Sequence, residues 1–317
     1  MIKIIELFAG IGSQIQAIKN LNIDAKTAAI SEIDKYAIDA YSHLHGEVLN
    51  LGDISKINLD SIPNCDLMTY SFPCQDISVA GAQAGLNEGS NTRSSLLWEC
   101  EKLIKEKRPK YLLMENVKNL VGTTHKHNFE KWLKILENYG YTSYWKILNA
   151  NHFDTPQNRE RVFCVSIYGK HTPFIFEEGT LTNKNIRSIL EPEENIPDNM
   201  YINKPFISRI PSKSDSGLIQ VGNLEMAGNE AIKRVYSPDG ICPTLTTMTG
   251  GHRQPKILLD NGKVRKLTPR ECWKLMGFTD EQFDKVAYQS NTQLYKQAGN
   301  TICVKCLESI FKQLFKE

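Results

Sequence analysis

The chain has 317 residues, a formal net charge of +2, 41% hydrophobic residues and 23% charged residues. This is the balance of an ordinary globular protein with one large domain, or with one domain and a substantial second lobe. No apolar run is long enough to span a membrane, and the amino terminus has no signal peptide. These features exclude a membrane-spanning class and predict a cytoplasmic protein with reduced thiols.

The chain opens with a strand, a glycine turn and a helix. Residues 2–7 are a near-continuous apolar run, Gly10 and Gly12 follow, and a helical pattern covers residues 13–21. Glycines let a backbone turn tightly and approach a ligand closely. This order is that of the first unit of a nucleotide-binding sheet.

Two acids follow the second predicted strand, which covers residues 26–30 and precedes an expected helix over residues 34–44. Glu32 stands roughly 20 residues beyond the glycines, where an acid can hold a pair of ribose hydroxyls. Asp53 is a second acid near a strand end. A local cap or a solvated turn is the alternative for each, and the spacing favours the ligand interpretation mainly for Glu32.

A cysteine stands in the turn after the next strand. The apolar run 66–70 predicts a buried parallel strand, and Pro73 stiffens the turn that carries Cys74. Ligands of open α/β sheets bind at the carboxyl ends of the strands. Most free cysteines are small buried hydrophobes, but the polar residues after Cys74 argue against burial. The long irregular stretch 79–92 is typical of a loop that closes over a substrate.

The rest of the sheet follows in the predicted order of helix 94–107, strand 111–114, helix 127–138, strand 142–149 and strand 162–168. Glu115 ends the first of these strands, in the same row as Cys74. Arg159 and Arg161 alternate, so both are expected on one face of an extended segment. Paired arginines suit an anion or a carboxylate, although a solvated edge strand would also explain them.

The character of the chain changes from His171 to about Asn261, where prolines, glycines and small polar residues dominate. Between Lys204 and Lys274, twelve Lys and Arg stand against six Asp and Glu, a local net charge of +6. A basic, loop-rich lobe is a plausible nucleic-acid surface. An ordinary small β domain with solvated lysines is the alternative.

Two helix starts are expected near the carboxyl end. Thr268 caps one helix with Pro269 in its first turn, and the segment 297–301 opens a last helix that runs to about Phe315. Cys303 and Cys306 have CxxC spacing, but no second pair or histidine stands near them. Two small residues on a helix are therefore favoured over zinc, and the eight cysteines indicate no disulfide framework.

With these motifs in place, the chain resembles the DNA (cytosine-5) methyltransferases along nearly its whole length. The matching segments are Phe8 to Gly12 (methyl-donor loop), Pro73-Cys74-Gln75 (catalytic loop), Glu115-Asn116-Val117 and Gln157-x-Arg159-x-Arg161 (second and third catalytic motifs), Arg265 to Cys272 (brace of the recognition lobe) and Gly299-Asn300-Thr301 (returning motif). Two positions depart from the family pattern. Ile33 stands where the family often has an aromatic residue, and Thr301 replaces a commoner serine.

The resemblance implies a doubly wound, mostly parallel α/β sheet, the Rossmann-like fold of S-adenosylmethionine-dependent methyltransferases. Residues 1–170 and 286–317 would form the catalytic domain, and residues 171–285 a smaller, loop-rich β target-recognition domain. The implied methyl donor is S-adenosyl-L-methionine, with S-adenosyl-L-homocysteine as product. Phe8 would pack on the adenine, Glu32 would take the ribose hydroxyls and Asp53 would accept from the adenine amino group. The donor site would also include Gly10, Gly12, Ile33, Ile54, Pro73, Leu96, Asn300 and Thr301, and no metal.

The resemblance also implies roles in chemistry on a flipped-out cytosine. Cys74 would attack C6, Glu115 would hold N3 and the exocyclic amine, and Arg159 would hold O2 and keep Glu115 oriented. Either arginine, Arg159 or Arg161, would favour the thiolate, and Asn116 belongs to the same catalytic set. Gln75 would fill the gap that the base leaves, and the DNA-binding set would be Arg93, Thr244, Leu245, Gly250, Gly251 and Arg253. The expected partners of a monomeric enzyme are duplex DNA and a separately acting restriction endonuclease.

Three alternatives stay open at the level of the sequence. A tRNA cytosine-5 methyltransferase would keep the chemistry, and transfer of labelled methyl to DNA or to tRNA separates the two. A non-catalytic DNA-binding regulator would have a decayed pocket, whereas every proposed catalytic position is intact. A small-molecule methyltransferase on the same sheet would not require residues 171–285.

Overall fold

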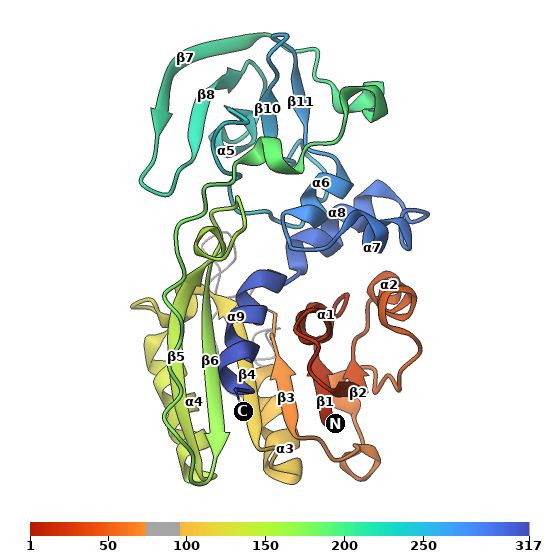
Figure 1. Ribbon diagram of the computed structural model, residues 1–317, viewed down its shortest axis with the longest axis vertical. Coiled ribbons are helices and arrows are strands. Elements are labelled where there is room, and N and C mark those ends of the chain that lie inside the picture. Colours follow the sequence, from red (N-terminus) through yellow and green to blue (C-terminus); the bar gives the residue numbers. More distant parts are fainter. Residues whose placement is uncertain (74–95, 317) are drawn as a thin grey trace. The chain divides into compact units, whose positions relative to one another are not determined.

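The computed structural model describes residues 1–73 and 96–316, which form two compact units (Figure 1). The first unit comprises Met1–Leu148, Glu160–Glu177 and Leu307–Glu317, and the second comprises Asn149–Arg159 and Glu178–Cys306. These boundaries differ from the predicted ones. Residues 149–159 and 286–306 group with the second unit, and residues 171–177 with the first.

A six-stranded sheet forms the centre of the first unit. Its strands are β1 (Ile2–Leu7), β2 (Ala25–Ser31), β3 (Leu67–Tyr70), β4 (Tyr111–Val117), β5 (Tyr141–Asn149) and β6 (Glu160–Tyr168), in the order β2-β1-β3-β4-β6-β5. β1 runs parallel to β2 and β3, β3 runs parallel to β4, and β6 runs antiparallel to β4. The predicted α/β fold with a mostly parallel sheet is confirmed.

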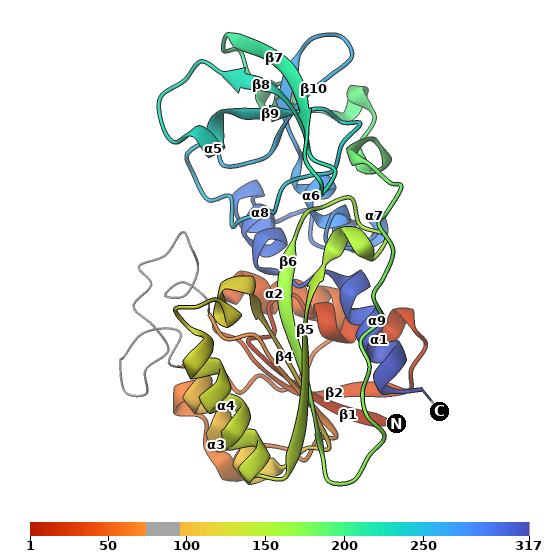
Figure 2. The ribbon, with the colours of Figure 1, turned by 90° about the vertical axis from the view of Figure 1, so that its left-hand side faces the viewer.

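Helices cover both faces of this sheet: α1 (Ser13–Asn20), α2 (Lys35–His45), α3 (Leu97–Lys107), α4 (Lys126–Asn138) and the C-terminal part of α9 (Val304–Leu314). Figure 2 shows α3 and α4 on one side of the strands and α1 and α9 on the other. Met68 and Met114 pack with Trp98 and Trp132 in one buried cluster. Because both faces are covered, β1, β3 and β4 are largely apolar rather than alternating.

The fourth strand continues further than its apolar run. β4 extends to Val117 because it pairs with β6 along its whole length, so Glu115 lies opposite Phe163 inside the ladder. This pairing gives the Glu115 side chain a fixed direction, which a turn residue would not have.

The second unit contains a five-stranded sheet and four helices. Its strands are β7 (Phe206–Lys213), β8 (Ile219–Leu224), β9 (Arg234–Tyr236), β10 (Lys256–Leu258) and β11 (Val264–Lys266), in the order β11-β10-β9-β8-β7. The helices are α5 (Glu230–Lys233), α6 (Pro269–Lys274), α7 (Asp280–Asp284) and α8 (Asn291–Asn300). Leu224, Val235 and Val264 form a small core on the sheet. Thr268 and Glu271 make a reciprocal capping box at α6, as the sequence predicts.

The predicted last helix is wrong at its start. Residues 297–300 close α8 instead of opening a new helix, and α9 begins only at Val304. A Cβ on Gly299 would lie 1.9 Å from the Thr246 carbonyl oxygen, so that close approach requires glycine. The Gly299 and Thr301 carbonyls accept from Arg159, which replaces the helical hydrogen bonds lost at the break.

Candidate functional site

The glycine turn after β1 is held open by backbone conformations that favour glycine. Gly10 and Gly12 have φ of 55° and 77°. The Gly10 N–H donates to Glu32 Oε2 at 2.9 Å, and the other Glu32 oxygen accepts from the N–H groups of Ile33 and Asp34. Apart from its chain neighbours, no described residue lies within 4 Å of a Cβ built on Gly10, which leaves space beside this turn for a ligand. An acid and an open glycine at adjacent strand ends fit a nucleoside-containing donor.

The other predicted donor residues of this unit differ in their surroundings. Asp53 Oδ1 accepts from the Ser55 N–H and hydroxyl and so caps the short 3-10 helix Ile54–Lys56. These hydrogen bonds, that of the Ser55 hydroxyl above all, lower the pKa of the Asp53 carboxyl. Asp53 is therefore a local cap, because its side chain accepts hydrogen bonds from the turn that it begins. Ile33 is 74% exposed, whereas Ile54 is buried and Phe8 and Leu96 pack partly buried against the sheet core.

Glu115 and Arg161 form an ion pair on adjacent strands. Arg161 Nε lies 3.2 Å from Glu115 Oε1, and both side chains are largely buried. Val117 lies opposite Arg161 in the ladder, so Glu115 and Arg161 are diagonal neighbours on one face. Desolvation of both partners strengthens a charge-assisted contact of this kind and fixes its geometry.

Asn116 ties the end of β4 to the turn that precedes Cys74. Its Nδ2 donates to the Phe72 carbonyl at 3.0 Å, and Phe72 is buried. Because Phe72 is two residues before Cys74, this bond holds the entry to the predicted catalytic turn beside Glu115. Cys74, Gln75 and Arg93 themselves lie outside the described residues, and Pro73 is the last one before the gap.

Arg159 has a different environment from Arg161. It is 3% exposed within the second unit, and its guanidinium donates to the carbonyls of Leu245, Gly299 and Thr301. The sequence predicts Arg159 as the residue that orients Glu115, whereas the ion pair given by the structure is made by Arg161. These bonds fasten the 245 segment to the end of α8, and the role of Arg159 towards Glu115 stays a prediction.

Of the two residues predicted to contact DNA ahead of the exposed loop, Leu245 needs correction, whereas Thr244 stays a prediction. Leu245 is 1% exposed, so its side chain does not face a ligand. Its N–H donates to Gln157 Oε1. The Thr244 hydroxyl donates to the Asn158 carbonyl. Both residues join the 157–159 segment to the chain that follows.

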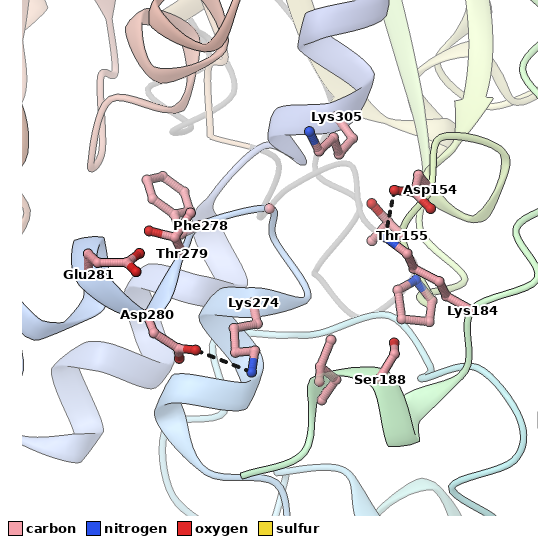
Figure 3. A pocket seen from close by; sticks show the side chains of 13 residues that line it. Asp154, Thr155, Lys184, Ser188, Lys274, Phe278, Thr279, Asp280, Glu281 and Lys305 are labelled. Carbon is pink, nitrogen blue, oxygen red and sulfur yellow. Dashed lines mark hydrogen bonds and ion pairs between the residues drawn. The ribbon is translucent and has the colours of Figure 1, made fainter.

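A pocket of about 430 Å³ lies within the second unit, and none of the predicted site residues lines it (Figure 3). Lys184 Nζ is 2.6 Å from Asp154 Oδ2, and Lys274 Nζ is 3.5 Å from Asp280 Oδ2. These two ion pairs close within the lining, and no ligand class follows from the pocket. In the described part of the chain no cluster of His, Cys, Asp or Glu could hold a metal ion. No described helix is long and apolar enough to cross a membrane.

Glu6 is a buried residue that the sequence analysis did not single out, although an acid within an apolar strand was its signal. It is fully buried in β1, and its Oε1 accepts from the Ile15 N–H in the first turn of α1. Oε2 has no hydrogen-bond partner among the described residues. Burial raises the pKa of Glu6 to about 7, against the opposing effect of the nearby Tyr41 hydroxyl. This carboxyl anchors the helix that follows the glycine turn.

Glu6 should therefore make stability depend on pH. Its folded pKa is raised, so its contribution is fully present below the unfolded value of about 4.5 and is lost as pH rises through 7. We expect the free energy of unfolding of wild type, relative to Glu6→Gln, to fall by about 3 kcal/mol between pH 4.5 and 8. Urea unfolding of both proteins across this range measures the difference. Parallel pH curves would show that Glu6 does not titrate in this window.

Comparison with known proteins gives the family. Residues 2–316 match the C-5 cytosine-specific DNA methylase family. The chain belongs to this family. It is 39% identical to the type II methyltransferase M2.ScrFI of Lactococcus lactis subsp. cremoris, over 100% of this chain and 99% of that one. It is 32% identical to the orphan methyltransferase M.SPBetaI of Bacillus phage SPbeta, over 99% and 97% of the two chains.

A third relative of this DNA (cytosine-5-)-methyltransferase is the type II enzyme M.HhaI of Haemophilus parahaemolyticus, 31% identical over 98% of this chain and 93% of that one. Solved structures support the fold. The Entamoeba histolytica methyltransferase EhMeth matches 100% of this chain and 99% of its own with a TM-score of 0.77 at 18% identity. The S. pombe Dnmt2 methyltransferase matches 99% and 98% with a TM-score of 0.74 at 21% identity. The family uses S-adenosylmethionine.

Proposed function

We propose that this enzyme methylates C5 of a cytosine flipped out of a specific short duplex DNA sequence, through attack of Cys74 on C6. The Glu115–Arg161 ion pair, at 3.2 Å beside the anchored Phe72 turn, carries this proposal. It places an oriented carboxylate at the strand end next to the one that leads to the cysteine. Cytosine C5 is not nucleophilic enough to accept a methyl group unaided, so a site of this kind must activate the ring.

The donor would be held by the glycine turn and the acids of the first unit. Glu32 is proposed for the ribose hydroxyls, and Gly10 leaves the space for close approach. Asp53 would accept from the adenine amino group through lone pairs that the Ser55 contacts leave open, and Phe8 would pack on the base. Asn300 and Thr301 belong to the same proposal. The bound donor supplies the electrophilic methyl group that C5 accepts.

Cys74 would start the reaction by forming an S–C6 bond. An unperturbed thiol has a pKa of about 8.5, and the positive charge of Arg161 would favour the reactive thiolate. As sulfur adds, the ring electrons move towards N3, and Glu115 supplies the proton that neutralises N3. Arg161 keeps the Glu115 carboxyl directed at the base. C5 then has enamine character and can take up the methyl group.

The reaction ends with β-elimination. A base removes the proton from C5, the C5–C6 double bond forms again, the S–C6 bond breaks to release the Cys74 thiolate, and N3 returns its proton to Glu115. A stacked base cannot reach the pocket, so the cytosine must leave the duplex. Gln75 is proposed to fill the gap, and Arg93 to hold a phosphate when the loop between them closes. We also propose that the enzyme is a monomer, that it is cytoplasmic, and that its partner restriction endonuclease acts separately.

The exposed loop of Gly250, Gly251, His252 and Arg253 is proposed to face DNA. Burial, together with Lys266, Lys256 and Lys204, lowers the pKa of His252, so three lysines act on this loop. Lys233, another basic residue of the unit, is 2.9 Å from Glu230 and so already engaged. Arginine bound to guanine O6 and N7 is the commonest specific major-groove contact. Arg253 is therefore proposed as a base reader.

Replacement of Arg253 by alanine tests both the activity and this assignment. Cells that express the wild type should acquire 5-methylcytosine in one short DNA motif. Arg253→Ala should relax the choice at one base pair of that motif, since a bidentate arginine contributes about 1–3 kcal/mol of discrimination. Methylome sequencing measures both, with exposed Lys263→Ala as the control, which should keep the motif. Lower methylation with an unchanged motif would make Arg253 a phosphate contact, and no cytosine methylation by wild type would refute the function.

A further inference from the structure

Lys256 is a buried lysine for which the described residues offer no carboxylate partner. It lies on β10 with 1% exposure. Its Nζ donates to the His252 carbonyl at 2.6 Å and to the Gln254 carbonyl at 3.1 Å. Burial, with the added repulsion of Lys266, lowers the pKa of Lys256 to about 8. Both acceptors are neutral, so the positive charge is solvated only by two backbone dipoles.

The surroundings of Lys256 are basic or apolar. Lys266 on β11 stands directly opposite it in the antiparallel ladder, and Val235 stands opposite it on β9. Like charges directly opposite one another destabilise a sheet. Lys204 belongs to the same positive field, because it acts with Lys256 and Lys266 on His252. Among the described residues, no acid contributes to the shift in the pKa of Lys256.

A buried cation without a counter-charge destabilises the folded state. A methionine would fill the same space at lower free-energy cost, because a buried charge must give up its hydration. Departures from local rules without compensation mark functional sites. The two carbonyls that Lys256 holds belong to the proposed DNA-facing loop, whose residues Gly250, Gly251 and His252 all have positive φ. The Lys256 ammonium group therefore fastens the loop to the sheet, and its positive charge adds to the electrostatic potential at the loop.

We propose that Lys256 positions the loop Gly250 to Gln254 on the DNA backbone, and that a DNA phosphate supplies the counter-charge that the fold omits. This inference rests on the proposed assignment of the loop to DNA. Lys256 acts through the loop and its electric field rather than by touching a base, so it is a positioning residue. Its charged form should bind DNA more tightly than its neutral form. Above pH 8, the free enzyme loses this proton, and DNA binding must then take a proton up.

Replacement of Lys256 by methionine removes the charge and both hydrogen bonds but keeps the length of the side chain. At pH 7 we expect the KM for DNA to rise about tenfold, while kcat and the KM for the methyl donor stay within about twofold. Lys263→Met is the matched control, since it removes one exposed lysine of the same unit and should change the KM for DNA by less than about threefold. Wild type should lose DNA affinity between pH 7 and 9 more steeply than Lys256→Met does.

Proton uptake by wild type gives a second test of the proposal. Calorimetric titration of wild type with duplex DNA lacking the target cytosine, in two buffers of different ionisation enthalpy, should show uptake of about half a proton at pH 8. Lys256→Met should show none of it. Absence of uptake by wild type at pH 8, or equal uptake by both proteins, would overturn the proposal. If the loop does not face DNA at all, Arg253→Ala and Lys256→Met will both leave the KM for DNA unchanged; if only the role of Lys256 is wrong, the Arg253 effect will remain.

Discussion

Cys74→Ser is expected to lower methyl transfer at least about 100-fold, the usual scale for a lost nucleophile. A serine hydroxyl does not ionise near neutral pH, so it cannot add to C6 as the thiolate does. Binding of the methyl donor should stay within about twofold of wild type, because Glu32 and the glycine turn that are proposed to hold it belong to other strand ends. Single-turnover transfer of labelled methyl to duplex DNA measures the first quantity, and calorimetry the second.

Matched results separate chemistry from folding. Cys65→Ser changes a partly buried cysteine of the same unit and should keep nearly full activity. Transfer by Cys74→Ser above about one percent of the wild-type rate would mean that another group attacks the base or that the reaction is not covalent.

Arg161→Ala is expected to lower kcat about 100-fold and to leave the KM for the methyl donor nearly unchanged. The variant removes the cation 3.2 Å from Glu115, so the carboxyl loses its fixed direction and the site loses the positive charge proposed to favour the Cys74 thiolate. Arg161→Lys keeps the charge without the planar group and should recover part of the rate. Steady-state kinetics with DNA and donor varied separately measure the change.

The neighbouring ion pair on the same strand end gives the control. Lys118 Nζ lies 2.9 Å from Glu160 Oε1 on the exposed side, and Lys118→Ala should change kcat by less than about twofold. If Arg161→Ala loses no more activity than Lys118→Ala, the Glu115–Arg161 pair only supports the sheet, and the orienting role returns to Arg159.

Sequence patterns predict the strands of the first unit well, because each strand is marked by an apolar run within its own sequence. Runs such as 2–7 and 66–70 are mostly apolar, as strands covered on both faces require. The second unit depends on contacts between segments distant in sequence, which periodicity does not register. The break between α8 and α9 follows from the approach of Gly299 to the Thr246 carbonyl, and no property of residues 297–301 alone indicates it.

The candidate site shows the same division. Glu32, Glu115 and the glycine turn can be predicted because each follows a recognisable strand. The different environments of Arg159 and Arg161 cannot, since two residues of spacing place them on one face of a strand that begins only at Glu160. Glu6 interrupts an apolar run and Lys256 precedes one, but burial without a compensating charge becomes evident only in three dimensions.

Duplex DNA with 5-fluorocytosine at the target position tests covalent attack by Cys74 most directly. Fluorine cannot leave C5 as a cation, so β-elimination stops and the S–C6 bond persists. With wild type and methyl donor, we predict a protein–DNA adduct that survives denaturation, maps to Cys74 by peptide analysis, and is absent with Cys74→Ser. Complete separation of wild-type protein from the fluorinated DNA on denaturation, under conditions in which ordinary DNA is methylated, would contradict the covalent mechanism.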